Sequence, residues 1–146
     1  MKFDKPERGA VIRYAYLWAD EHDRGQVEGF KDRPTLVIAI SVVKESDVIR
    51  VLVVAITHTP PRNASGAMPL PGEVARRLRL DNQPAWIVTT EANGFTWPGP
   101  DLRPVPGRDP ATPTYGRVPD KLLKQVILSY LDNFAKGKTR VVDRSE

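Results

Sequence analysis

Apolar positions in the first sixty residues form three runs that predict β-strands. In the run from 10 to 18 the larger side chains alternate, which places four of them on one face of the strand: Ile12, Tyr14, Tyr16 and Trp18. The runs from 34 to 43 and from 48 to 58 are almost continuously apolar, as expected of strands that are covered on both faces. Pro34 can only open its strand, because proline has no amide hydrogen to donate to the sheet.

The segments between these runs predict a loop and a turn. Residues 19–32 are almost entirely polar, and Gly25 and Gly29 provide turn points, so we expect a long loop. Residues 44–47 separate the second and third strands by a length that suits a β-hairpin.

The second half of the chain predicts two helices and one further strand. Residues 71–80 predict a short basic helix with Pro71 near its start. Between 119 and 137 apolar residues recur at helical spacing, with Pro119 at the start and Gly137 at the end. The alternation from 85 to 91 predicts a strand that ends at Glu91.

These elements predict a mainly β fold. Several short strands, tight turns and one terminal helix indicate a small, strongly curved antiparallel sheet or barrel, with a C-terminal α-helix and a short additional helix. We expect residues 1–138 to form a single domain, because a chain of 146 residues can bury one hydrophobic core and no linker divides it. Residues 139–146 are expected to form a flexible tail.

Composition narrows the expected compartment and partners. The chain has no cysteine, which excludes disulfides and thiolate metal sites, and no apolar stretch approaches the ~20 residues of a membrane helix. The first residues lack the apolar core of a signal peptide, so we expect a cytoplasmic protein. The 22 basic and 18 acidic side chains give a net charge of +4, which favours an anionic partner such as nucleic acid or an acidic protein.

The predicted hairpin brings the far ends of its two strands together at one edge of the sheet. Arg33 opens the second strand, and Thr57 and His58 end the third, so pairing predicts that these side chains lie near one another. Glu91, at the end of the next strand, can approach the same edge. A cation, a hydroxyl, an imidazole and a carboxylate suit phosphodiester chemistry: the cation stabilises charge on phosphate, and a base accepts a proton from an attacking hydroxyl.

Each of these residues also has a purely structural interpretation. Arg33 can pair with a neighbouring carboxylate, Asp32 or Glu28, and Thr57 can simply occupy a position in the sheet. His58 follows Thr57 directly, so the two side chains point to opposite faces unless the pair of prolines that follows breaks the strand early. In the structural interpretation His58 caps the strand end or packs on a neighbouring loop.

A cluster of polar residues in the first loop could be drawn as a metal site. His22 lies among Asp20, Glu21 and Asp23. A solvated, charged loop is the better interpretation, because loops that bind hard metals need glycine and oxygen ligands in a fixed order. We therefore expect no metal site.

Three stretches of the chain, in this order, resemble the MazF/PemK toxin family of the CcdB/MazF superfamily: Gly9-Ala-Val-Ile-Arg-Tyr, Lys31-Asp-Arg-Pro-Thr-Leu-Val-Ile and Val53-Val-Ala-Ile-Thr-His. That family opens with a glycine and an apolar strand. An arginine–proline pair then leads a second apolar strand, and a later apolar strand ends in isoleucine–threonine. The resemblance covers about the first sixty residues and continues loosely to Val105.

The resemblance implies an SH3-like barrel that forms a homodimer. It also implies a type II toxin–antitoxin system, in which an endoribonuclease is neutralised by an antitoxin, here expected to be an acidic protein. The functional arginine of the family falls on Arg33 and its threonine on Thr57. We therefore expect a toxin-like hydrolase that cleaves single-stranded RNA without metal or cofactor, with Lys31 and Arg62 binding the substrate.

In this hypothesis the 2′-hydroxyl attacks the adjacent phosphate, Arg33 stabilises the phosphorane, and Thr57 orients the phosphate. His58 is the candidate general base or acid on chemical grounds, because an unperturbed imidazole serves both roles near neutral pH. Glu91 is the next candidate for proton transfer. Two alternatives stay open: a catalytically inactive barrel that binds a protein partner, and a non-catalytic nucleic-acid-binding module.

Overall fold

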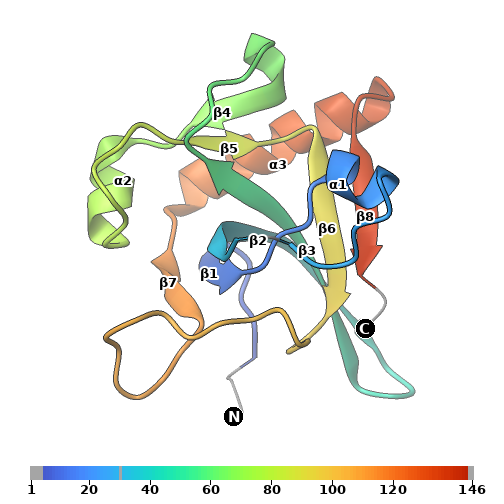
Figure 1. Ribbon diagram of the computed structural model, residues 1–146, viewed down its shortest axis with the longest axis vertical. Helices are drawn as coiled ribbons and strands as arrows, with labels where there is room; N and C mark the ends of the chain where they lie inside the picture. The colour runs from blue at the N-terminus through green and yellow to red at the C-terminus, as the bar shows by residue number, and fades with distance from the viewer. Residues whose placement is uncertain (1–4, 30, 145–146) are drawn as a thin grey trace.

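The computed structural model describes residues 5–29 and 31–144, which form a mainly β structure (Figure 1). One sheet contains eight strands: β1 (Ala10–Tyr14), β2 (Arg33–Val43), β3 (Val48–Thr57), β4 (Ala67–Pro69), β5 (Trp86–Val88), β6 (Glu91–Thr96), β7 (Thr114–Arg117) and β8 (Arg140–Arg144). The helices are α1 (Ala19–Asp23), α2 (Gly72–Arg77) and α3 (Asp120–Ala135), with a single 3-10 turn, η1 (Ala64–Gly66). The predicted mainly β class, the terminal helix and the short basic helix are confirmed. No helix within the described ranges is long and apolar enough to span a bilayer.

The sheet is built around the β2–β3 hairpin, which turns at the predicted residues 44–47. Hydrogen-bonded neighbours follow the order β4-β5-β3-β2-β1-β7, and β6 pairs with the middle of β3. These pairings are antiparallel, whereas β8 pairs parallel to β6. The start of β2 therefore lies beside the end of β1, and the end of β3 lies beside β5, rather than at a free tip.

The first half of β2 is covered on both faces, as predicted for the whole apolar run, whereas Val42 and Val43 near its end are 56% and 44% exposed. Leu36 and Ile38 face a core in which α3 supplies four buried side chains: Leu122, Leu123, Val126 and Tyr130. Val37 faces a second core on the other side of the sheet, with Ile12, Tyr14, Tyr16, Val53 and Phe95. Successive side chains of a strand point to opposite faces, so one unbroken apolar run contributes to both cores.

The first strand is shorter than predicted, because the backbone leaves the sheet after Tyr14. The Ala15 amide donates to the Asp101 carbonyl (3.0 Å), and the Leu17 amide donates to the side chain of Asn93 (2.9 Å). Asp101 and Asn93 each lie more than seventy-five residues further along the chain than the amide that donates to them. The alternation through 18 therefore persists in an extended segment that is not a strand.

The loop predicted at 19–32 begins with a short helix, α1. The Trp18 amide donates to Glu21 Oε1 (3.0 Å), so a side chain three residues ahead satisfies an amide at the helix start. Five residues make too short a run for helical periodicity to be detected among so many charges. The prediction of an uninterrupted loop was wrong for these residues.

The strand predicted at 85–91 is divided into β5 and β6, and Glu91 opens β6. β5 pairs with the end of β3 and β6 with its middle, so the chain turns between them. Thr89 occupies this turn: its amide donates to the Gly66 carbonyl (3.0 Å), and its hydroxyl lies 3.0 Å from that of Ser129 on α3. The buried Thr89 is thus hydrogen-bonded to η1 and α3, and it interrupts strand pairing between β5 and β6 without breaking the alternation of side chains.

Residues 140–144, which were predicted to belong to a flexible tail, form strand β8. The strand runs parallel to β6 from the Glu91–Arg140 pair to the Phe95–Arg144 pair. Val142 and Arg144 are only 4% and 3% exposed, so the prediction was wrong for this segment. The last two predicted tail residues, Ser145 and Glu146, lie outside the described residues.

Candidate functional site

A cavity of about 530 Å³ lies where β2 begins, β3 ends and β6 begins, and we call it the Arg33 cavity. Its charged and polar lining consists of Arg33, Thr57, Thr59, Arg62, Asn63, Thr90 and Glu91. Its larger apolar surfaces come from Trp18, Pro60, Pro61, Ala67 and Val88. Four residues singled out in the sequence, from three strands and one loop, therefore line one cavity: Arg33, Thr57, Arg62 and Glu91.

Arg33 is half-buried, and its charge lies against an aromatic ring. Its Cζ is 5.0 Å from the centroid of the Trp18 ring, a cation–π distance. Asp32, the carboxylate that could have neutralised it, forms ion pairs with Arg13 (3.6 Å) and Arg103 (3.8 Å) instead. Among the described residues Arg33 forms no ion pair with Asp32 or Glu28, so the structural interpretation in which it only pairs with one of these carboxylates is wrong.

Burial has left this guanidinium with unused binding capacity. The Nε atom of Arg33 is buried and has no hydrogen-bond partner among the described residues. Burial lowers the pKa of Arg33, and the charge of Glu21 acts in the opposite direction. A buried donor without an acceptor costs free energy, and a guanidinium presents a fork of donors that matches carboxylate or phosphate oxygens. The part of this fork that lines the Arg33 cavity can donate to an oxyanion there.

Glu91 contributes the carboxyl group of the Arg33 cavity. Its Oε1 accepts hydrogen bonds from the Ala19 amide (2.9 Å) and from the Tyr16 hydroxyl (3.2 Å), which fix the orientation of the side chain. Burial raises the pKa of Glu91, while these two hydrogen bonds oppose the shift. A carboxyl group whose pKa is raised by burial is a better proton acceptor once it has ionised.

Tyr16 lies behind this carboxyl group. Its ring is buried and packs edge-on against Trp18, with 5.0 Å between the ring centroids. Burial, and secondarily the charge of Glu91, raises the pKa of Tyr16 well above its ordinary value. Tyr16 therefore stays a neutral hydrogen-bond donor to Glu91, and it links the carboxyl group to the aromatic surface that carries Arg33.

Thr57 and Arg62 complete the polar lining. Thr57 pairs with Trp86 in the sheet and also faces the cavity, and its hydroxyl oxygen accepts from the Thr59 amide (3.2 Å). The hydroxyl hydrogen of Thr57 remains available to a ligand oxygen. Arg62, on the loop after β3, is exposed and brings a second positive charge to the rim.

His58 does not reach this cavity. Its imidazole lines a separate hollow of about 240 Å³, where Nε2 lies 2.9 Å from Asp81 Oδ2 and Nδ1 lies 3.0 Å from the Pro84 carbonyl. β3 ends at Thr57 and the chain bends at His58, whose imidazole contacts Asp81 and Pro84 rather than Arg33. The expected approach of His58 to Arg33 was wrong, and His58 ties a loop to the strand end instead.

Lys31 also lies apart from the lining of the Arg33 cavity. It is exposed and precedes Asp32, which holds the chain against Arg13 and Arg103. Its position on the approach to β2 does not bring it among the cavity residues. That Lys31 binds substrate therefore stays a prediction, and its position outside the cavity lining does not support it.

Three residues that shape the site were not identified as functional from the sequence: Tyr16, Trp18 and Asn63. The aromatic pair was assigned to the core face of a strand, because alternation cannot distinguish core packing from the wall of a cavity. One signal was available for Trp18, since Glu21 three residues later matches the spacing of a helix start. A helix beginning there would have turned the segment away from the sheet.

Residues 5–29 and 31–144 contain no group of three or more His, Cys, Asp or Glu side chains that could hold a metal ion. In α1, Asp20 accepts from Arg140 Nη1 (3.0 Å) and Asp23 also accepts from Arg140, so these carboxylates take part in ion pairs. The side chains of the Arg33 cavity include a guanidinium that can bind an oxyanion, a hydroxyl that can orient it, and a carboxyl group that can move a proton. Comparison of the chain with protein-family models, curated proteins and solved structures finds no match.

Proposed function

We propose that this protein is a metal-independent endoribonuclease of the MazF/PemK-like kind, with an SH3-like barrel and its active site in the Arg33 cavity. One observation carries the proposal: a half-buried arginine with an unpaired Nε shares a cavity with the threonine and the glutamate that phosphodiester chemistry needs. The motifs around Gly9, Arg33 and Thr57 support the same assignment, because the family's arginine and threonine are the two residues that meet here.

In the proposed reaction the 2′-oxygen of a nucleotide attacks the adjacent phosphorus. Glu91, as a carboxylate, accepts the 2′-hydroxyl proton, and Arg33 donates hydrogen bonds to the oxygens of the phosphorane. Thr57 donates a hydrogen bond to a phosphate oxygen and so keeps the phosphorus oriented for in-line attack by the 2′-oxygen. The bond from phosphorus to the 5′-oxygen then breaks, and that oxygen takes a proton from water. The products are a 2′,3′-cyclic phosphate and a free 5′-hydroxyl.

Glu91 takes the proton-transfer role that was first assigned to His58. It lines the Arg33 cavity, whereas His58 lines another hollow. The hydrogen bonds from Tyr16 and Ala19 both end on Oε1, and Oε2 accepts no hydrogen bond among residues 5–29 and 31–144. That oxygen can accept the proton without breaking the contacts that orient the side chain.

The deciding experiment is an RNA cleavage assay with purified protein in the presence of a chelator. We expect cleavage of a mixed-sequence single-stranded RNA and none of the DNA of the same sequence, because DNA lacks the attacking hydroxyl. A single 2′-deoxy substitution 5′ to the cleaved phosphate should block cleavage there. Intact RNA at high enzyme concentration would contradict the proposal.

The same assay separates the alternatives. A nucleic-acid-binding module would retard the RNA in a gel without cutting it, and Arg33→Ala would abolish the shift. A barrel that binds only a protein partner would do neither. As part of the proposal we expect a cytoplasmic homodimer that is inhibited by an acidic antitoxin protein, and light scattering of the purified protein tests the dimer directly.

A further inference from the structure

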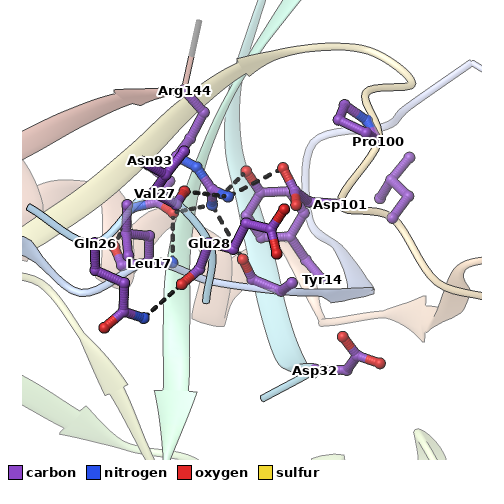
Figure 2. Close-up of polar contacts among 12 residues, drawn as sticks. Tyr14, Leu17, Gln26, Val27, Glu28, Asp32, Asn93, Pro100, Asp101 and Arg144 are labelled. Atoms are coloured by element: carbon purple, nitrogen blue, oxygen red, sulfur yellow. Dashed lines mark hydrogen bonds and ion pairs between the residues drawn. The ribbon is translucent and has the colours of Figure 1, made fainter. Parts of the chain in front are cut away.

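Strand β8 is hydrogen-bonded to the segment that carries Tyr16 and Trp18. Figure 2 shows Arg144 of β8 among its partners: Nη1 donates to the Ala15 carbonyl (3.0 Å) and the Tyr14 hydroxyl (3.2 Å), and Nη2 forms an ion pair with Asp101 (3.0 Å). The side chains of Arg144 and Asp101 are only 2% and 9% exposed. A forked cation in a buried position therefore ties three distant segments together: the end of β8, the chain after β1, and the loop at 101.

Asn93 of β6 forms a second attachment to the same segment. Its Oδ1 accepts from the Leu17 amide (2.9 Å), and its Nδ2 donates to the Leu17 carbonyl (2.8 Å). Arg144 Nη1 also donates to Asn93 Oδ1 (3.2 Å), so the two attachments are joined. The backbone of residues 15–17, which has left the sheet, is thus hydrogen-bonded by side chains from β6 and β8.

Alternation along this segment links the attachments to the Arg33 cavity. Leu17 and Ala19 pack on Val142 of β8 in a small buried cluster. Tyr16 and Trp18 point the other way, where Tyr16 donates to Glu91 and Trp18 lies under Arg33. A shift of the segment away from β8 would therefore displace both aromatic side chains from the groups they support.

Two more contacts of β8 lie beside Glu91. Arg140 pairs with Glu91 in the parallel register, and its amide donates to the Thr90 carbonyl (3.0 Å). Its guanidinium holds Asp20 and Asp23 of α1 from outside. In Figure 1, β8 lies alongside β6, the strand that carries Glu91, and behind α1.

We infer that β8 is a positioning element of the candidate site and that Arg144 is its principal positioning residue. Arg144 touches neither the Arg33 cavity nor a substrate there. It acts through residues 14–17, which fix Tyr16 against Glu91 and Trp18 against Arg33. The catalytic part of this inference rests on the proposed function, but the positioning itself does not.

The test compares three variants of the full chain. Arg144→Lys keeps a cation near Asp101 but loses the fork that reaches Asp101 through Nη2 while Nη1 reaches Tyr14, Ala15 and Asn93. The double variant Arg144→Met with Asp101→Asn removes the ion pair without leaving a buried charge unpaired. Asp143→Ala is the matched control: it lies next to Arg144 on β8, but its ion pair is with Arg50 of β3 (2.6 Å).

Two readouts do not depend on activity. In both Arg144 variants we expect exchange of the Ala19 amide, which donates to Glu91, to accelerate about tenfold or more, while that of the central Val54 amide is unchanged. The NMR signals of the Arg33 side chain, displaced in the wild type by the Trp18 ring current, should move toward their values in a free chain. Asp143→Ala should change neither. An Ala19 amide and Arg33 signals that stay at their wild-type values in Arg144→Lys would overturn the inference.

Cleavage provides the third readout. We expect kcat to fall about 10- to 100-fold in the Arg144 variants, because a small misplacement of catalytic groups is costly, with KM changed by no more than about threefold. If wild-type protein cleaves no RNA, the proposed function fails, and the exchange and NMR results still decide the positioning role. If the double variant does not fold, Arg144→Lys alone decides, and wild-type kinetics in that variant would count against the catalytic part.

Discussion

The guanidinium of Arg33 lies over the indole of Trp18, with 5.0 Å between Cζ and the ring centroid. This contact neutralises none of the charge, because an aromatic ring attracts a cation without accepting its full set of hydrogen bonds. The cation is therefore held in place while its donors remain available. That combination distinguishes a binding arginine from one that is used up in a surface ion pair.

Replacing Trp18 tests whether the ring holds the cation. We expect Trp18→Leu to weaken binding of a single-stranded RNA about 2- to 30-fold, which corresponds to a cation–π contribution of about 0.5 to 2 kcal/mol. Trp18→Phe keeps an aromatic face and should lose less than half of that free energy. Fluorescence anisotropy of a labelled RNA gives both affinities. Equal affinities of the Leu variant and the wild type would show that the ring is not needed.

Replacing Arg33 tests the charge itself. Arg33→Ala should reduce cleavage about 100- to 1,000-fold and leave a folded protein, because one preorganised donor to the transition state is lost. Arg33→Lys should restore activity only in part, since an ammonium cannot present two parallel donors to phosphate. Lys44→Ala, exposed in the turn after the other end of β2, is the control and should stay within about threefold of wild type. Circular dichroism checks the fold, and cleavage by the Ala variant at the wild-type rate would end the assignment.

The raised pKa of Glu91 predicts how cleavage depends on pH. Burial raises this pKa, so the carboxylate that accepts the proton forms only above the ordinary range of a glutamate. The cleavage rate should rise with pH through that raised pKa, and Glu91→Gln should abolish the rise together with about 100- to 10,000-fold of the rate. Rates measured from about pH 4 to about pH 8 test this. A Gln variant that keeps the acidic limb would exclude Glu91 as the base.

The same pKa predicts a dependence of stability on pH. The folded protein binds the Glu91 proton more tightly than the unfolded chain does, so the stabilisation is fully present below the unfolded pKa of ~4.3. It is lost as pH rises through the folded pKa. Relative to Glu91→Gln, the wild-type free energy of unfolding should therefore decrease over this interval in urea titrations. Glu73→Gln, at an exposed position on α2, is the control and should give a curve parallel to wild type.

His58 supplies a prediction of little change in activity. Its imidazole lies near Asp81 and the Pro84 carbonyl in a hollow distinct from the Arg33 cavity. His58→Gln should therefore keep cleavage within about threefold of wild type, with the same pH profile. Kinetics of the variant check this directly. A loss of about 100-fold or more, the range of a general acid or base, would restore the role that the sequence first indicated.

Local chemistry was enough to predict much of the frame. The unbroken apolar run at 34–43 predicted a strand covered on both faces. Leu36 and Val37 do face different cores, but the end of the strand at Val42 and Val43 is exposed. Helical spacing after Pro119 predicted α3, and the short turn at 44–47 predicted the hairpin. These features depend on periodicity and turn length, which neighbouring residues carry by themselves.

Only the tertiary structure decided what surrounds Arg33 and how the chain ends. Trp18, Glu91 and Arg33 meet because residues 15–19 leave the sheet, and they leave it under the control of Asn93, Asp101 and Arg144. Those partners are more than seventy residues away in the sequence, so no local pattern predicts the contacts. Strand β8 was not predicted for the same reason. In the sequence alone Arg144 looks like a solvated residue of a tail. In the fold, distant segments supply a buried carboxylate for its charge and carbonyl and hydroxyl oxygens for its donors.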